Sequence, residues 1–87
     1  MPKVSEFYGI KIIFNYRGEH NPPHFHATYG EMEALVQISP AGLLQGSLPP
    51  RLAGMVIEWT LLHQEVLLKN WTLAREQKPL IQIEGLP

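Results

Sequence analysis

The proline pair Pro49–Pro50 divides the chain into two halves that must fold differently. The residue before a proline avoids the α region, so a helix can begin at Pro50 but hardly before it. From Pro50 to Gln77 the sequence contains no further proline and only one glycine, Gly54. This stretch of about 28 residues predicts a long helix, and the stretch before Pro49 must supply most of the remaining fold.

The predicted helix is long for a chain of this size. At 1.5 Å per residue it would span about 42 Å if it were straight. We expect a break near residues 70–72, where Asn70 ends one helix or Thr72 caps the next. The expected architecture therefore contains one long or broken helix.

Apolar side chains fall on two sides of this helix. At 100° per residue most of them form one broad stripe that should pack on a sheet. A second ridge on the far side, formed by Ile57, Leu61 and Leu68, predicts contact with a partner. His63 lies inside the main stripe, either as a hydrogen-bonded core histidine or as a neighbour of the histidines near the N-terminus. The main stripe comprises Leu52, Met55, Val56, Trp59, Leu62, His63, Val66, Leu67 and Asn70.

Before Pro49, apolar and polar residues alternate in short runs, which is typical of half-buried strands. Gly30–Glu31 has the composition of a two-residue hairpin turn between two of these runs. The expected strands cover residues 10–16, 24–29, 32–38, 43–46 and 80–83. The predicted fold class is α+β, with a small antiparallel sheet packed against the helix. That sheet has three to four N-terminal strands plus a short C-terminal strand.

Length, charge and composition limit the number of domains and the kinds of site that the chain can have. A chain of 87 residues suffices for one hydrophobic core, so residues 1–87 are expected to form a single domain. The formal net charge of -1 argues against broad electrostatic binding of nucleic acid. Cysteine is absent, which excludes thiolate metal sites and cysteine nucleophiles. No segment resembles a membrane span or a signal peptide, so we expect a cytoplasmic protein.

Three of the four histidines surround a second proline pair, in the run EHNPPHFHA of residues 19–27. Two histidines at positions i and i+2 of a strand project to the same face, as two imidazole ligands of one metal ion would require. A third histidine could reach the same ion across the loop. Zinc or another divalent metal would then keep a position for water and lower the pKa of that water. The predicted metal ligands are His20, His24 and His26, with Glu19 or Glu33 as an extra ligand or base.

A structural interpretation of the same run is also open. His24 and His26 lie opposite Phe25 and Ala27, so they could occupy the solvated face of an antiparallel sheet. The segment 21–23 would then be a rigid turn that sets the hairpin register. The chain has no phosphate-binding loop and no Ser-His-Asp order, and no nucleophile stands out. The sequence therefore leaves open whether the protein is an enzyme.

Five runs carry a family likeness: Phe7–Ile10, His20–Ala27, Gly46–Pro49, Glu58–Trp59 and Asn70–Trp71. Together they resemble a bacterial family of small proteins known as domain-of-unknown-function family 4160. The likeness covers almost the whole chain, and the histidine-proline run is its most specific part. It implies a free-standing cytoplasmic protein whose gene lies beside another small uncharacterised family, an arrangement similar to toxin-antitoxin modules. It supplies no catalytic residue.

Two functions follow as hypotheses. The favoured one is a protein-interaction module of a toxin-antitoxin-like gene pair. This module would bind a small protein partner or form a homodimer through Ile57, Leu61 and Leu68. The alternative is a metal-dependent hydrolase or ribonuclease that uses the histidine cluster.

Overall fold

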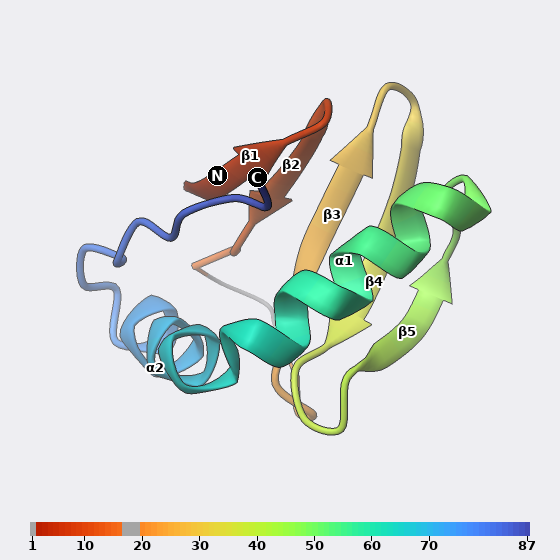
Figure 1. The fold of residues 1–87 in the computed structure, drawn as a ribbon. Helices are drawn as coiled ribbons and strands as arrows, with labels where there is room; N and C mark the ends of the chain where they lie inside the picture. The colour runs from red at the N-terminus through yellow and green to blue at the C-terminus, as the bar shows by residue number, and fades with distance from the viewer. Residues whose placement is uncertain (1, 17–19) are drawn as a thin grey trace.

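A computed structural model describes residues 2–16 and 20–87. Within these ranges five strands form one antiparallel sheet in chain order, and two helices follow the sheet (Figure 1). The elements are β1 (Lys3–Phe7), β2 (Ile10–Ile13), β3 (His24–Tyr29), β4 (Met32–Gln37), β5 (Gly42–Gly46), α1 (Pro50–Leu62) and α2 (Gln64–Arg75). The α+β class is therefore confirmed. None of the helices in these ranges is long and apolar enough to cross a membrane.

The strands differ from the prediction at the two ends of the chain. The alternation in residues 10–16 continues past the end of β2, which stops at Ile13. The first strand, β1, was not predicted because its register shifts between Lys3 and Ser5, so Val4 and Ser5 are both buried and period two is lost. The predicted C-terminal strand at 80–83 is wrong, since this segment has no regular strand structure.

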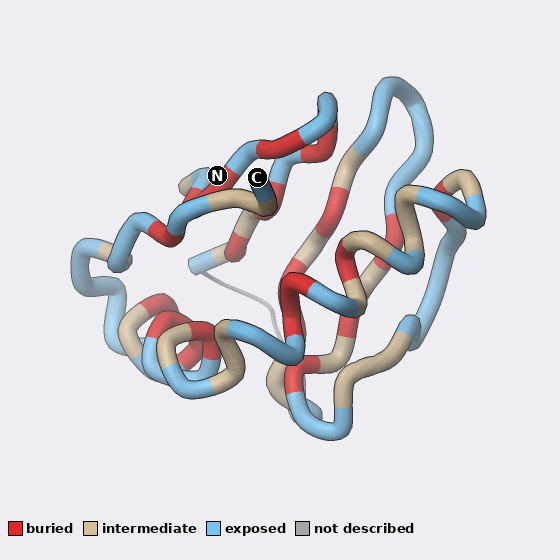
Figure 2. Tube along the Cα trace, viewed as in Figure 1, coloured by how far each residue is buried: buried red, intermediate tan, exposed pale blue. Residues whose placement is uncertain are grey.

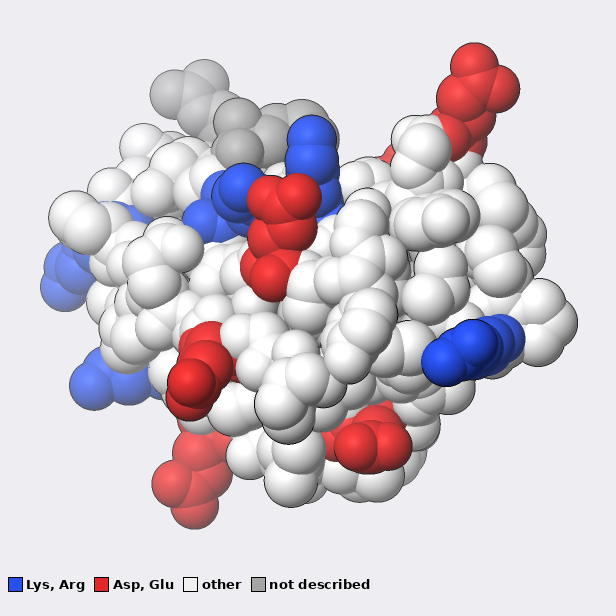
Figure 3. Space-filling view, turned by 45° about the horizontal axis from the view of Figure 1, so that its top comes forward, with Lys and Arg blue, Asp and Glu red and all other residues white. Residues whose placement is uncertain are grey.

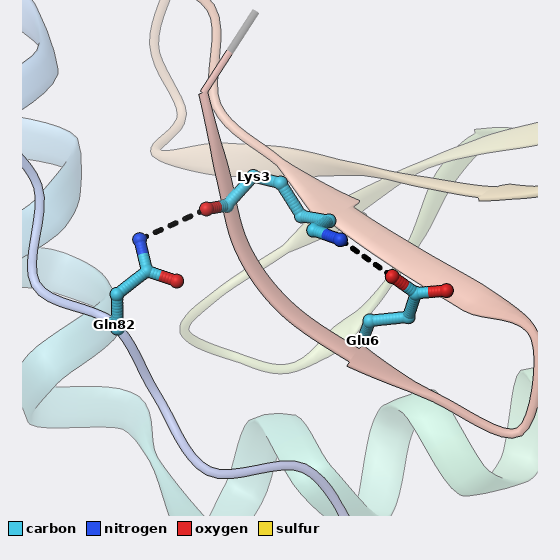
Figure 4. Close-up of polar contacts among 3 residues, drawn as sticks. All are labelled: Lys3, Glu6 and Gln82. Atoms are coloured by element: carbon cyan, nitrogen blue, oxygen red, sulfur yellow. Dashed lines mark hydrogen bonds and ion pairs between the residues drawn. The ribbon is translucent and has the colours of Figure 1, made fainter.

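The C-terminal segment nevertheless runs beside β1 (Figure 1). The backbone N–H of Ile83 donates to the Val4 carbonyl at 2.8 Å, and Gln82 Nε2 donates to the Lys3 carbonyl at 3.0 Å (Figure 4). On the same strand Lys3 donates a hydrogen bond to Glu6. That bond and the positive charge of Lys3 lower the pKa of the Glu6 carboxyl.

The helix breaks earlier than predicted. It begins at Pro50 as expected, but α1 ends at Leu62 and His63 separates it from α2. Asn70 does not end a helix, because it lies buried inside α2 and holds the C-terminal segment. Its Nδ2 donates to the Ile81 carbonyl at 2.9 Å, and its Oδ1 accepts from the Ile81 N–H at 2.8 Å. The side chain therefore serves a tertiary contact and does not compete with its own helix.

Buried residues of the sheet and of the helices form one core (Figure 2), and Trp59 of α1 is fully buried in it. Its ring centroid lies 5.3 Å from that of Phe7 in β1 and 5.8 Å from that of Phe25 in β3. Its Nε1 donates to the Glu84 carbonyl at 2.9 Å. One residue thus joins both helix and sheet to the C-terminal segment.

The main apolar stripe is only partly confirmed. Val56, Trp59 and Leu67 are buried, whereas Leu62 is exposed. Leu62 is the last residue of α1, so the exposed member of the stripe lies at the end of that helix.

Gly46 at the end of β5 offers a test of this fold. Its φ is 79°, and a Cβ there would overlap the carbonyl oxygen of Glu33. Gly46→Ala should lower the free energy of unfolding by more than about 1 kcal/mol, because the strained backbone and the overlap add. The matched control is Gly54→Ala in α1, which has open space around it and should be stabilising by about 0.5–1 kcal/mol. Urea unfolding measures both, and equal effects would contradict this geometry.

Candidate functional site on the outer face of the sheet

The histidine run places two imidazoles on the face of the sheet opposite α1, here called the outer face. Phe25 and Ala27 are buried on the side of Trp59, so His24 and His26 point the other way, as predicted. They are not solvated, however. His24 is 7% exposed and the His26 side chain 14% exposed. The face assignment is therefore confirmed, and the expectation of a solvated face is wrong for these two residues.

His24 is buried by contacts at the end of the sheet. Its ring centroid lies 5.0 Å from that of Trp71 in α2. Its Nδ1 is 2.8 Å from the Pro22 carbonyl oxygen, which can only accept, so the ring nitrogen donates. One step further along the chain, the Ile38 N–H donates to the Pro23 carbonyl. The proline segment thus supplies acceptors that tie the loop to β3 and β4.

His26 is the middle member of a polar chain across the outer face, formed by Asn15, His26 and Glu33. Its Nδ1 lies 2.8 Å from Glu33 Oε2, and its Nε2 lies 3.1 Å from Asn15 Nδ2. Because the carboxylate accepts and the amide nitrogen donates, these partners together specify the tautomer with the proton on Nδ1. A carboxylate that orients an imidazole in this way is a device that acid-base sites also use.

A shallow pocket of about 220 Å³ opens beside this chain. Glu33 stands half-exposed at its side and Leu35 supplies an apolar wall. No hydroxyl or thiol is present among the described residues that line it, so the pocket contains an orienting carboxylate and an imidazole without a nucleophile. The lining residues are His26, Glu33, Leu35, Gln45 and Gly46.

The predicted metal ligands are only partly brought together. The ring centroids of His24 and His26 lie 5.8 Å apart, whereas His20 is exposed in the loop before β3. In the part of the chain that the structure describes, no group of three or more His, Cys, Asp or Glu could hold a metal ion. His26 has partners on both ring nitrogens, so metal binding would require it to give one up. The bond from His24 Nδ1 to a backbone carbonyl is of the kind that also orients metal-ligating imidazoles. The metal site stays a prediction.

Three further predicted residues have different outcomes. Glu19 lies outside the described residues. Glu33 is next to His26, as a base or ligand would need to be. His63 lies at the helix break with its ring 5.3 Å from that of Trp59, on the opposite side of the sheet from His26. His63 therefore does not join the cluster.

Asn15 was missed as a site residue. The alternation that buries Ile12 and Phe14 also puts Asn15 on the outer face, so a signal was present. Alternation along one strand predicts the face on which a side chain lies, but it does not predict which residue of another strand that side chain contacts. The contact between Asn15 and His26 of β3 could therefore not be predicted.

Charge on the face that Figure 3 shows is scattered. Acidic and basic side chains lie in small groups of both signs, separated by uncharged surface. Among the described residues drawn there, no broad basic surface of the kind that binds a nucleic-acid backbone is seen.

The comparison with known proteins gives a family and no activity. The model of a family described as Domain of unknown function (DUF4160) matches residues 9–72. The match therefore begins at the turn after β1 and ends within α2, and it contains the whole outer-face site. No curated protein and no solved structure matches the chain.

The tautomer of His26 is a first test of the site. We expect long-range ¹⁵N–¹H correlation spectra to show the proton on Nδ1. Glu33→Ala removes the acceptor and should shift the spectrum toward the other tautomer, which is the commoner form of an unrestrained imidazole. Glu31→Ala, in the exposed turn two residues away, should leave the His26 signals unchanged. Identical spectra for both variants would contradict the Glu33 contact.

The metal prediction is tested by elemental analysis of protein purified without a histidine tag. A divalent ion that binds only the folded chain must raise Tm when zinc, nickel or manganese is added. His24→Ala and His26→Ala should each abolish that rise, and His63→Ala is the control that should retain it. No stoichiometric metal together with an unchanged Tm would refute the metal site.

Proposed function

The chain belongs to the DUF4160 family, and we propose that it acts as a protein-interaction module for a small protein partner. The observation that carries this proposal is a pair of adjacent leucines at the end of α1. Leu61 is 59% exposed and Leu62 is 65% exposed, more than any other large apolar side chain of the described residues. Two such neighbours at one point of the surface favour burial against another molecule.

These leucines border a hollow of about 440 Å³ at the helix break. We call it the junction surface; it is lined by Leu61, Leu62, His63, Gln64, Glu65 and Val66. Of the residues predicted to contact a partner, Leu61 and Leu68 are exposed, whereas Ile57 packs in part against the core. The contact that we propose therefore centres on Leu61 and Leu62, with Leu68 on the neighbouring helix.

The charges beside the junction surface favour a different protein over a second copy. Glu65 is the one charged residue that lines this surface, and Glu58 lies one turn before Leu62, while the exposed Lys69 follows Leu68. Both carboxylates are exposed. Two copies that met through this surface would bring like charges together, which costs free energy. A partner with apolar anchors and a basic rim fits better.

The family likeness suggests which protein this partner is. The resemblance implies that the gene lies beside a second small uncharacterised family, as in a toxin-antitoxin pair, so the neighbouring gene product is the first partner to test. The alternative function, a metal-dependent hydrolase or ribonuclease, depends on the three histidines. It ranks second because the described residues contain no three-ligand group.

The proposal is tested by mixing the protein with the neighbouring gene product. Light scattering should show a complex, and the double variant Leu61→Ser/Leu62→Ser should weaken its affinity by at least about tenfold, because each buried leucine is worth about 1.5–3 kcal/mol. The variant should stay folded, since both side chains are already exposed.

Met32→Ser is the matched control, an exposed apolar residue on the β3–β4 hairpin that should leave the affinity unchanged. A wild-type protein that forms no complex would refute the proposal. So would equal losses of affinity in the control and the double variant.

A further inference from the structure

The two edge strands of the sheet, β1 and β5, differ in whether another segment of the chain hydrogen-bonds to them. At one edge, β1 is flanked by the C-terminal segment. Gln82 of this segment donates to the Lys3 carbonyl (Figure 4), and the Ile83 N–H donates to the Val4 carbonyl. Tyr8, just after β1, also donates to the carbonyl of Pro87. At the other edge, β5 has β4 on one side and no described segment bonded on the other (Figure 1).

β5 is open on its faces as well as on its edge. Its residues are intermediate or exposed throughout, whereas the other four strands each contain buried residues (Figure 2). Leu43 is 42% exposed and Leu44 is 43% exposed. A strand with an unpaired row of N–H and C=O groups and apolar side chains is a template for another strand.

The usual protection of an edge strand is largely missing. The sequence of β5, GLLQG, has no charged residue and no proline. One irregularity is present, because the register with β4 shifts between Leu35 and Val36 and leaves Leu44 as the extra residue. This bulge shortens the regular part of the edge, so any strand pairing there should be reversible.

We propose that β5 pairs antiparallel with β5 of a second copy of this chain, so that the two sheets become continuous. An antiparallel pair related by a two-fold axis is self-complementary, since each donor meets the acceptor of the same strand in the other copy. The strand is uncharged, so this contact brings no like charges together, unlike contact through the junction surface. Because β1 is already covered, the pairing closes as a dimer and does not extend into a fibre.

The pairing also has a consequence for the outer-face pocket. Gln45 and Gly46 line that pocket and belong to the edge strand itself. The two pockets of a dimer would therefore lie on the same continuous sheet, on either side of the new strand pair.

Sedimentation velocity of the full chain tests the pairing from micromolar to millimolar concentration. The wild-type protein should show a monomer-dimer equilibrium. Leu44→Lys should raise the dissociation constant by about tenfold or more, because a lysine on an edge strand opposes strand addition and each copy would bring one to the contact. Met32→Lys adds the same charge at similar exposure away from the β5 edge and should leave the constant unchanged.

Two further measurements separate loss of pairing from loss of folding. Thermal unfolding shows whether each variant is folded, and the β5 amides of wild-type protein should exchange with deuterium more slowly as concentration rises. A protein that stays monomeric with concentration-independent exchange overturns the pairing. A dimer that Leu61→Ser/Leu62→Ser abolishes and Leu44→Lys leaves intact also overturns it. Failure to bind the neighbouring gene product bears on the junction surface alone.

Discussion

The packing of Trp59 is the interaction on which the rest of the structure depends. Its ring meets Phe7 and Phe25, and its indole N–H is satisfied by the Glu84 carbonyl. A buried indole needs such a partner, since an unmet donor costs free energy. The same side chain therefore holds α1 on the sheet and brings the C-terminal segment toward β1. This segment covers the β1 edge of the sheet, whereas the β5 edge has no such cover among the described residues.

The outer face follows from the same packing. Once Phe25 faces Trp59, the alternation of β3 puts His24 and His26 on the other side. Trp71 and the proline segment then cover His24, while Glu33 and the amide of Asn15 hold His26. The histidine run is thus a packed and hydrogen-bonded part of the fold, beside a small pocket. The structural role of the histidine run is to join the loop before β3 to the sheet and to α2. In any acid-base reaction at this site, the reacting group would be His26, which Glu33 orients.

Local patterns predicted some elements well and others badly, for identifiable reasons. The start of α1 at Pro50 and the β3–β4 hairpin were predicted, because proline dihedrals and period-two alternation act within a few residues. The strand β1 was not predicted, because a register shift removes the alternation of buried and exposed residues in it. The helix break was misplaced to Asn70, since nothing local reveals that this amide is used by Ile81, eleven residues away.

The sequence by itself determined the α+β class, the helix start and the common face of His24 and His26, because these depend on backbone sterics and side-chain alternation. Only the tertiary structure decided that Trp71 buries His24, that Glu33 orients His26, and that β5 is the open edge. Each of these depends on which distant segments come to lie side by side. That choice is made by the packing of the whole core, and no short pattern in one strand or helix records it.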